Sequence, residues 1–445
     1  MQLLQQLIFI LIAGFAIFLF ARNVGRIRRN ILLGKDESEG DRKDRPGQRW
    51  KNVVLLAFGQ KKMFKRPLPA IMHFFIYAGF VLINIEVLEI LIDGFFHGGP
   101  HHTFEPILGG FYDVVIGFFE ILAVLTLVAV TVFLIRRNII KVRRLAMPEL
   151  DGWPKQDANI ILFIEIGLMF ALLVMNSAEH AIRLQEGEAG GFLISSLIAP
   201  MFAGLSISTL TTIQYICWWG HILGILAFLN YLPFSKHFHI LLAFPNAYYT
   251  RLDPQGEMRN MPDIQKEVLI MLDPSAAPPP SENEPTEPPR FGARDVQDLG
   301  WRNLLDAYSC TECGRCTAVC PANLTGKKLS PRKIMMDTRD RLEEVGKQLD
   351  AKKDWKEDGK SLLHDYITTE ELRACTTCNA CVEACPVGIE PLSIINQLRA
   401  NLIMEESNAP GEWNAMFSNI ENNMAPWKFS PDDRDKWAEE LNAAG

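Results

Sequence analysis

Long apolar runs separated by charged stretches occupy the first 250 residues of this 445-residue chain, and a charged, soluble-type composition follows them. A helix needs roughly 20 mainly apolar residues to cross a bilayer. The apolar runs predict five membrane-spanning helices, at residues 3–20, 68–92, 108–135, 159–178 and 209–234. The apolar stretch from 190 to 206 is too short for a sixth span and predicts an interfacial helix instead.

Lys and Arg are distributed unevenly between the loops that join these predicted spans. Residues 22–66 and 136–144 are rich in both, whereas 93–107 has neither and 179–208 has only Arg183. Because Lys and Arg accumulate in cytoplasmic loops, the pattern predicts a multi-pass protein of the cytoplasmic (inner) membrane with its N-terminus outside. The first span lacks the basic start and small-residue cleavage site of a signal peptide, so we expect a retained anchor.

The second half of the chain divides into a linker, a domain and a tail. A Pro-, Glu- and Ser-rich stretch at 274–291 cannot bury a core and predicts an extended tether. The net charge of −7 counts against a nucleic-acid partner, because such a partner requires a basic surface. The predicted units are a membrane domain at 1–250, a linker at 251–294, a soluble domain at 295–405 and a tail at 406–445.

Eight of the nine cysteines fall in two runs that share one spacing, C-x-x-C-x-x-C-x-x-x-C-P. The first run is Cys310, Cys313, Cys316 and Cys320, and the second is Cys375, Cys378, Cys381 and Cys385. This is the spacing of two-cluster bacterial ferredoxins, in which the fourth cysteine of each run binds the other run's cluster. Zinc is the alternative, but four cysteines followed by Pro favour two [4Fe–4S] clusters. The ninth cysteine, Cys217, is expected to be a buried thiol.

The residues between the two runs have helical character. Helix formers dominate 331–350 and 368–374, so a helical ferredoxin fits better than a small β-rich one. The runs CTECGRCTAVCPA and CTTCNACVEACPVGIEPLSIINQLR resemble the iron–sulfur C subunit of heterodisulfide reductase over residues 295–405. Together with the spans, this indicates an all-α protein: a five-helix membrane bundle followed by an α-helical ferredoxin domain.

Histidines in membrane helices are costly and are usually functional. His73 lies near the inner end of the second predicted span, His221 near the outer end of the fifth, and His239 just past its inner end. Eighteen residues separate His221 from His239, about five helical turns or ~27 Å, so one helix face would present an imidazole to each side of the bilayer. Pro233 makes this same-face geometry approximate, and His237 is an alternative to His239.

The run from His221 through Leu232-Pro233 to His239 resembles the last helix of the nitrate reductase gamma subunit. It is also similar to the cytochrome subunit of membrane-bound heterodisulfide reductase. The resemblance covers roughly residues 1–250. In that family both histidines bind haem b, so the resemblance implies haem b bound within a five-helix bundle.

The chain departs from this family in its second helix. The family carries a second histidine ten residues after the first, but here Ile83 follows His73 at that distance. We therefore expect an inner haem between His73 and His239, and an outer haem on His221 only if another ligand is found. His180 lies at a suitable depth; the alternatives, in the first outer loop, are His97, His101 and His102.

Four glutamates lie within the predicted spans: Glu86, Glu89, Glu120 and Glu165. Glu86 and Glu89 are three residues apart and share a helix face. A proton path to or from a quinone would explain such residues, because quinone chemistry couples two electrons to two protons. Pairing with a neighbouring helix is the alternative.

These patterns predict an electron-transfer subunit of a quinone-linked oxidoreductase, with menaquinone or another quinone as its membrane substrate. No G-x-G-x-x-G between strand and helix and no CCG-type cysteine run occurs in the sequence. We therefore expect a cytoplasmic partner, either a heterodisulfide reductase B-like (CCG-motif) subunit or an electron-transfer flavoprotein. The alternatives are a component of an electron-transfer flavoprotein:menaquinone oxidoreductase, a subunit of a larger respiratory supercomplex, and a redox-sensing, membrane-tethered ferredoxin.

Overall fold

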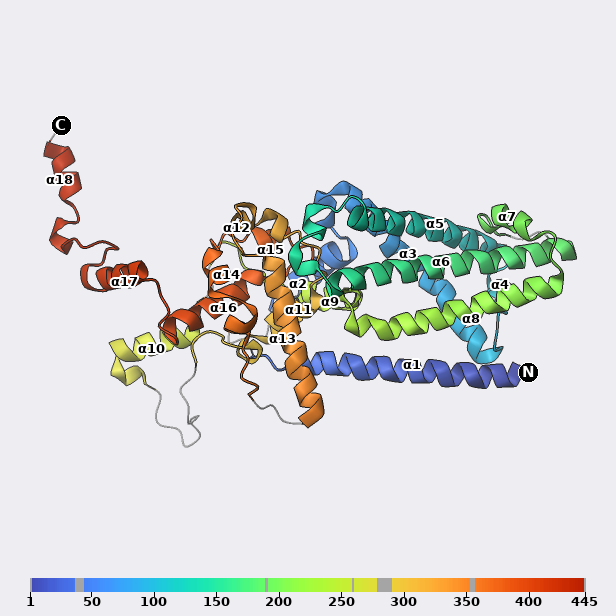
Figure 1. Cartoon of the computed structure of the whole chain (residues 1–445), viewed down its shortest axis with the longest axis horizontal. Coiled ribbons are helices and arrows are strands. Elements are labelled where there is room, and N and C mark those ends of the chain that lie inside the picture. The colour runs from blue at the N-terminus through green and yellow to red at the C-terminus, as the bar shows by residue number, and fades with distance from the viewer. Residues whose placement is uncertain are drawn as a thin grey trace.

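The computed structural model describes residues 2–36, 44–188, 191–257, 260–277, 290–352 and 357–443. In these ranges the secondary structure is helical, apart from two isolated β-bridges, which confirms the predicted all-helical class. A long helix bundle is joined end-on to a smaller cysteine domain (residues 290–404), and a tail extends beyond it (Figure 1). We call the bundle end at the cysteine domain the near end. The N-terminus lies at the opposite, far end.

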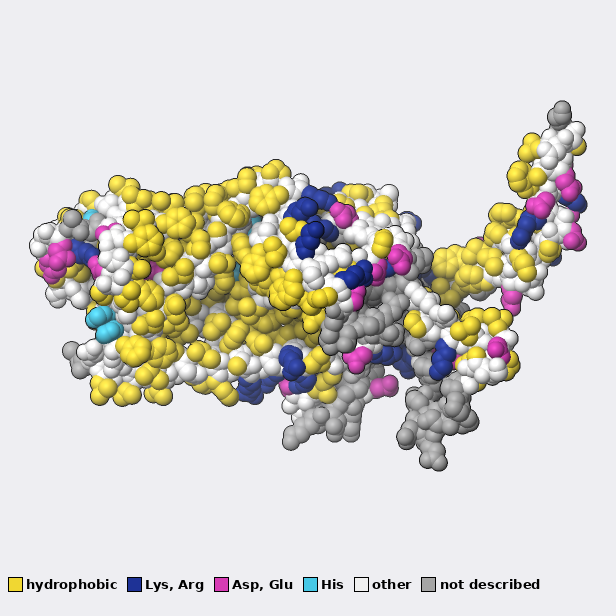
Figure 2. Space-filling model, turned by 180° about the vertical axis from the view of Figure 1, so that it is seen from behind, with side chains coloured by type: hydrophobic (Ala, Val, Ile, Leu, Met, Phe, Trp, Pro, Cys, Tyr) yellow, Lys and Arg dark blue, Asp and Glu magenta, His cyan; other side chains and the backbone are white. Residues whose placement is uncertain are grey.

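Five long helices form the bundle: α1 (Gln2–Ile31), α3 (Pro67–Phe96), α5 (Gly110–Asn138), α6 (Trp153–Glu186) and α8 (Ile207–Tyr231). All five are long and apolar enough to cross a membrane, as the sequence predicted. Hydrophobic side chains cover most of the bundle's visible face, while Lys and Arg gather where it meets the cysteine domain (Figure 2). An apolar surface of this extent suits a lipid environment.

Helix α1 continues well past the predicted span. Its apolar part is followed by Arg22, Arg26, Arg28 and Arg29, and arginine is a good helix former. After the helix ends, Lys35 pairs with the cysteine domain: its N–H donates to Leu299 O at 2.8 Å, and its carbonyl accepts from Trp301 N at 3.0 Å. The first helix thereby connects the bundle to the cysteine domain directly.

Helix α8 does not continue to His239, which corrects the expectation of one helix bearing both His221 and His239. Pro233 lacks an N–H and breaks the hydrogen-bond ladder. Two 3₁₀ turns, Leu232–Phe234 and Lys236–Phe238, follow α8. His239 then begins a separate helix, α9 (His239–Tyr248).

The segment predicted as an interfacial helix, 190–206, forms two short pieces at the far end, although Gly190 lies outside the described residues. These pieces are α7 (Ser195–Ile198) and a 3₁₀ turn, Ala199–Phe202. Ala199 packs against α6 and α8 in a small buried apolar cluster. The segment therefore covers the far end without forming one continuous helix.

The cysteine domain is built from α11 (Trp301–Ser309), α12 (Pro321–Leu324), α13 (Pro331–Lys352), α14 (Thr369–Ala374), α15 (Ala380–Ala384) and α16 (Pro391–Met404). The helices predicted at 331–350 and 368–374 correspond to α13 and α14. A capping box between Thr368 and Glu371 begins α14. Leu304, Ile334 and Leu398 are fully buried in the apolar core that these helices share.

Arg302 on α11 attaches the cysteine domain to the chain segment that follows the bundle. Its guanidinium donates to Asn246 Oδ1 at 2.5 Å and to Tyr249 O at 3.0 Å, and it pairs with Asp306 at 2.7 Å. Arg302 is 2% exposed. A buried charge without its partners is strongly destabilising, so these contacts hold α9 against α11.

The remaining helices lie outside the bundle and the cysteine core: α2 (Pro46–Asn52), α4 (Glu105–Leu108), α10 (Pro262–Leu272), α17 (Gly411–Asn423) and α18 (Lys436–Ala443). Helices α17 and α18 bury no residue and lead away from the rest of the chain (Figure 1). Most of the predicted tether falls on residues 278–289, outside the described residues.

A substitution at Gly34 tests the connection between α1 and the cysteine domain. A Cβ at Gly34 would lie 2.5 Å from Trp301 N and 2.9 Å from the Gly300 carbonyl carbon, and backbone cannot move aside cheaply. We expect Gly34→Ala to destabilise the fold by about 1–3 kcal/mol, as overpacking does. Thermal unfolding of the purified chain in detergent, followed by tryptophan fluorescence, measures this. Gly25→Ala, which meets nothing within 4 Å, is the control, and equal midpoints for the two variants would contradict the expectation.

Candidate functional site: two cysteine quartets and a histidine pair

The two cysteine runs fold into the same local turn. Glu312 and Thr377, each two residues after the first cysteine of its run, have φ of 55°. Gly314 and Asn379, each one residue after the second cysteine, have φ of 67° and 58°. Left-handed residues within a turn direct successive backbone N–H groups into a concavity that binds anions, including iron–sulfur clusters. The repeated spacing has thus produced a repeated backbone.

Backbone N–H groups also reach the cysteine sulfurs. Thr377 N donates to Cys375 Sγ at 3.4 Å, and Ile389 N donates to Cys385 Sγ at 3.3 Å. Hydrogen bonds to sulfur stabilise negative charge on a cluster and help to set its reduction potential.

The fold brings the fourth cysteine of each run to the other run, as the sequence predicted. The thiol of Cys316 interacts electrostatically with those of Cys313, Cys310 and Cys385 and, least strongly, with that of Cys381, while Cys385 interacts with Cys313. We call Cys310, Cys313, Cys316 and Cys385 the proximal quartet. A hollow in the cysteine domain is lined by the other four, which we call the distal quartet: Cys375, Cys378, Cys381 and Cys320.

The donor chemistry fits iron–sulfur clusters. Burial raises the pKa of Cys381 to about 12 and that of Cys385 to about 11, and a cluster's iron would reverse this effect by displacing the thiol protons. Within the described ranges no group of three His, Cys, Asp or Glu side chains is spaced to hold a single metal ion. Four thiols without other donors are the ligand set of a [4Fe–4S] cluster.

The two quartets differ in their surroundings. Cys310 of the proximal quartet is buried, and Arg144 of the bundle's near end donates to the carbonyl of Cys313. Cys378 of the distal quartet is exposed. The proximal quartet therefore faces the bundle, and the distal quartet is accessible from outside the chain.

His73 of α3 and His239 of α9 meet at the near end of the bundle. Their ring centroids are 6.5 Å apart, which leaves room for one metal ion between the ring edges. His73 Nδ1 bonds Gln60 Oε1 at 3.0 Å, and His239 Nδ1 bonds Lys236 O at 3.1 Å. Metal-ligating histidines are oriented in this way through one ring nitrogen, so that the other is available to the metal. The pair fits the axial ligands of a haem.

His237 lies beside this pair without such an anchor. Its ring centroid is 5.4 Å from the ring centroid of His239 and 5.3 Å from that of Phe228. Among the described residues neither of its ring nitrogens has a hydrogen bond to a side chain or backbone atom. Burial lowers the pKa of His237 to about 3, which keeps the ring neutral. The geometry favours His239 over His237 as the partner of His73.

His221 is buried deep in the bundle, and the structure does not bring His180 to it. His221 Nδ1 bonds Leu168 O at 3.0 Å. His180 is twelve residues further along the same helix as Leu168, about 18 Å away at 1.5 Å per residue, and it packs against Phe192. The three loop histidines make contacts at the far end, where His97 stacks on His101 and His102 bonds Tyr112.

The turn of the first cysteine run contacts the segment that orients His73. Arg315 donates to the carbonyls of Lys62 and Met63 at 3.3 Å each, two and three residues after Gln60. Its side chain is nearly buried and interacts electrostatically with Cys313 and Cys385. Arg315 therefore lies between the proximal quartet and the support of His73.

The same turn contacts the segment that orients His239. Glu312 pairs with Lys236, whose carbonyl holds His239, and with Arg339 at 2.8 Å. Burial raises the pKa of Glu312, but the two cations outweigh it and hold the pKa below its usual range. The first cysteine turn thus contacts both segments that orient the histidine pair, the loop after Gln60 and Lys236.

Sequence reasoning did not single out Gln60, Lys236, Glu312 or Arg315. For the last two a local indication existed, because both lie between cysteines of the first run. Gln60 has φ of 49° and lies in a loop that no motif marks. Its role depends on the tertiary contact with His73.

Comparison with known proteins supports the cysteine domain most directly. A family profile described as "4Fe-4S dicluster domain" matches residues 309–389. The "Probable iron-sulfur-binding oxidoreductase FadF" of Bacillus subtilis is 30% identical over 98% of this chain and 61% of its own length. The "EtfAB:quinone oxidoreductase" of Syntrophomonas wolfei is 29% identical over 92% of this chain and 56% of its own. A "Probable membrane-anchored ferredoxin" of Chromohalobacter salexigens is 26% identical over 75% of this chain and 46% of its own length.

The chain spans less than two thirds of the length of these relatives. No solved structure matches it. The chain carries a 4Fe–4S dicluster domain and is related, over most of its length, to iron–sulfur oxidoreductases.

Replacing Cys385 tests the exchange of cysteines between the runs. We expect Cys385→Ser to remove the cluster of the proximal quartet although Cys385 belongs to the second run, lowering non-haem iron from about eight to about four per chain. Iron and acid-labile sulfide analysis with electron paramagnetic resonance (EPR) of the anaerobically purified chain measures this. Cys217→Ser in α8 should leave both clusters intact. Loss of the distal cluster in Cys385→Ser, with the proximal one retained, would contradict the assignment.

Proposed function

We propose that this chain is a membrane electron-transfer subunit that connects a cytoplasmic redox partner with the membrane quinone pool. Electrons pass through two [4Fe–4S] clusters and haem b. The observation that supports this best is the position of the first cysteine turn. Through Glu312 and Arg315 it contacts both segments that orient His73 and His239.

The surroundings of the quartets favour one order of cofactors. The distal quartet, with exposed Cys378, is where a partner can deliver or remove electrons. The proximal quartet lies between it and the histidine pair, since Arg315 interacts with Cys313 and also with His73. The proposed route therefore runs from the distal cluster to the proximal cluster and then to haem b.

In this proposal His73 and His239 would hold a haem b at the near end, which would supply one-electron redox chemistry there. Gln60 and Lys236 fix the ring orientations and keep one nitrogen of each ring available for iron. His221, with its Nδ1 anchored on Leu168 O, is the proposed ligand of a second haem, for which the structure brings up no second imidazole among the described residues.

The near end is proposed to face the cytoplasm. Basic residues of α1 and α5, including Arg26, Arg29, Arg136 and Arg137, lie towards this end, as expected for the cytoplasmic side of a membrane protein. The N-terminus, at the far end, would then be outside (Figure 1). The cysteine domain would lie in the cytoplasm of a bacterial cell.

The proposed partner is an electron-transfer flavoprotein. One relative is named EtfAB:quinone oxidoreductase, which favours this version. A heterodisulfide reductase B-like unit with CCG-type cysteine runs is the alternative, as is membership of a larger respiratory supercomplex. Co-purification separates these cases, because flavoprotein subunits and a CCG-motif unit have different cofactors.

A second candidate is a redox-sensing, membrane-tethered ferredoxin, in which His73 and His239 have only a structural role. It is favoured by the name of one relative, "Probable membrane-anchored ferredoxin". The two candidates differ in haem content and in reactivity with quinone.

Cofactor analysis of the anaerobically purified chain tests the proposed function. The proposal predicts about eight non-haem irons and one or two haems b, with the dithionite-reduced haem reoxidised by a menaquinone analogue. Clusters without haem would contradict it and support the tethered ferredoxin.

Substitution of two neighbouring histidines tests which of them binds the near-end haem. We expect His239→Ala to lose the near-end haem, because the imidazole opposite His73 disappears, and His237→Ala to retain it. Haem content and the reduced-minus-oxidised spectrum measure the outcome, with iron content as the check on folding. Retention of haem in His239→Ala and its loss in His237→Ala would reverse the assignment.

A further inference from the structure

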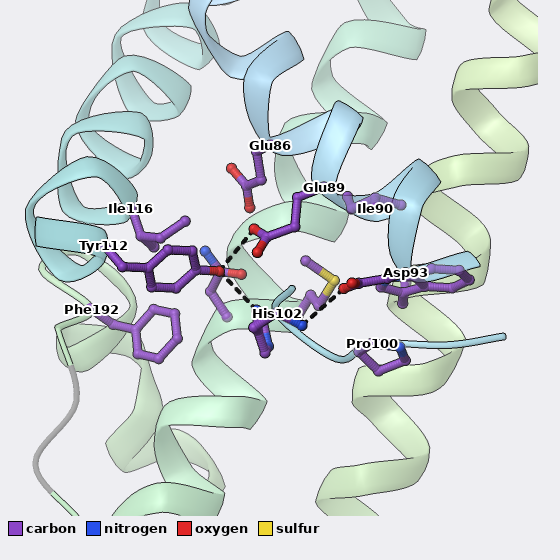
Figure 3. Close-up of a pocket in the computed structure, with 12 residues that line it drawn as sticks. Glu86, Glu89, Ile90, Asp93, Pro100, His102, Tyr112, Ile116 and Phe192 are labelled. Atoms are coloured by element: carbon purple, nitrogen blue, oxygen red, sulfur yellow. Dashed lines mark hydrogen bonds between the residues drawn. The ribbon is translucent and has the colours of Figure 1, made fainter. Parts of the chain in front are cut away.

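Polar side chains that the route above does not use gather inside the far end of the bundle (Figure 3). They come from α3, α5, α6 and the loop after α3, and they line a small hollow together with apolar residues. The polar lining residues are Glu86, Glu89, Asp93, His102, Tyr112 and Asn176. Ionisable groups within a membrane bundle are costly and mark ion or substrate pathways.

Three of these side chains, Glu89, Tyr112 and His102, form a hydrogen-bonded row, and His102 faces a further buried carboxylate, Glu179. Tyr112 OH donates to Glu89 Oε2 at 2.9 Å, and it also lies 2.9 Å from His102 Nδ1. His102 Nε2 lies 2.7 Å from Glu179 Oε2, close enough for an ion pair with protonated His102, although the angle does not meet hydrogen-bond geometry. Figure 3 shows Tyr112 between Glu89 and His102. Each neighbouring pair is joined through groups that can both accept and release a proton.

The row continues to the far-end surface. Arg183 binds Glu179 at 2.6 Å and Glu105 at 2.9 Å. The side chain of Glu105 is 37% exposed and that of His102 is 22% exposed, whereas that of Glu179 is only 6% exposed. The row Glu89–Tyr112–His102–Glu179 therefore leads from the bundle interior to water at the far end.

Glu86 lies one turn deeper on α3 and faces the same hollow. It is 6% exposed, and its Oε2 has no hydrogen-bond partner among the described residues. A buried carboxyl without a partner is costly unless it serves a ligand or a proton. Figure 3 shows Glu86 pointing towards the space next to Glu89.

The other acids of this region have structural partners that account for them. Asp93 accepts hydrogen bonds from the backbone of His101, His102 and Thr103, and so it holds the loop after α3. Glu120 accepts from the backbone N–H of Ile194 and from Asn176. Glu86 is the acid of this cluster that such contacts leave unexplained.

We propose that the row Glu89–Tyr112–His102–Glu179 conducts protons between far-end water and Glu86, and that Glu86 exchanges a proton with a quinone headgroup. This rests on the proposed function. Reduction of one quinone to quinol would take two electrons, supplied one at a time, and two protons through Glu86, and each proton is replaced from far-end water. Oxidation of quinol reverses every step.

A quinone carbonyl suits this position chemically. It is one small oxygen that accepts a hydrogen bond from a protonated carboxyl, and the hollow is otherwise lined by apolar side chains such as Ile90, Ile116 and Trp218. On α3, Ile85 and Leu88 are exposed on the bundle surface, where a hydrophobic quinone tail can remain in lipid. Trp218 is three residues, a rise of about 4.5 Å, from His221 on α8, so the hollow adjoins the proposed second haem ligand.

The test uses the full chain with a soluble menaquinol analogue, 2,3-dimethyl-1,4-naphthoquinol, as electron donor. Stopped-flow spectroscopy follows haem reduction in wild type, Glu86→Gln and Tyr112→Phe. Both substitutions preserve shape and remove only a proton-carrying group. We expect each to slow haem reduction by quinol at least about tenfold, within the usual contribution of proton-transfer groups. Cluster content and the dithionite-reduced haem spectrum should stay unchanged.

Glu186→Gln is the matched control, because Glu186 is an exposed acid at the far end of α6. In this variant, quinol should reduce the haem at the wild-type rate. In sealed vesicles whose cysteine domain faces outward, with valinomycin and potassium present, an entrapped pH dye should show that the protons from quinol appear in the lumen. The orientation is checked by protease access to the cysteine domain.

The outcomes separate the two proposals. If quinol reduces the wild-type haem but Glu86→Gln and Tyr112→Phe react equally fast, the proton row is refuted and the proposed function stands. Release of protons on the cysteine-domain side also refutes the row. If quinol does not reduce the wild-type haem, the proposed function fails and the row fails with it.

Discussion

The contact between the first cysteine turn and the near end of the bundle is the interaction on which the rest of this structure depends. Buried Glu312 pairs with Lys236, and Arg315 donates to the loop that follows Gln60. A buried ion pair is kept only when both partners stay in place, because removal of either leaves an uncompensated charge. The contact thus sets the distance between the cysteine quartets and the His73–His239 pair.

Two features elsewhere in the structure are energetically unfavourable by themselves and are explained by this arrangement. The helix break at Pro233 sacrifices backbone hydrogen bonds, but it brings His239 off the axis of α8 and opposite His73. At the far end, the bundle buries several ionisable groups that membrane helices normally exclude. Polar chemistry is therefore concentrated at the two ends of the bundle, one facing the clusters and the other facing water.

Local pattern accounts for most of what could be predicted from the sequence. Apolar run length predicted the five long helices, and the repeated cysteine spacing predicted the exchange that puts Cys320 and Cys385 in opposite quartets. Predictions that needed tertiary geometry fared worse. His180 was one candidate partner of His221, on depth alone, yet it lies far along α6, and the continuous helix through Pro233 does not form. The row through Tyr112 was missed because loop packing creates it.

The most direct test of this account is to inject single electrons from photoreduced deazaflavin into the anaerobic, oxidised chain while observing clusters and haem b together. The account predicts that the clusters are reduced first and that haem reduction keeps pace with their reoxidation. In Cys385→Ser, which would lack the proximal cluster, the phase in which haem reduction keeps pace with cluster reoxidation should disappear. Haem reduction at the same rate in wild type and Cys385→Ser would contradict the proposed route from the cysteine quartets to the histidine pair.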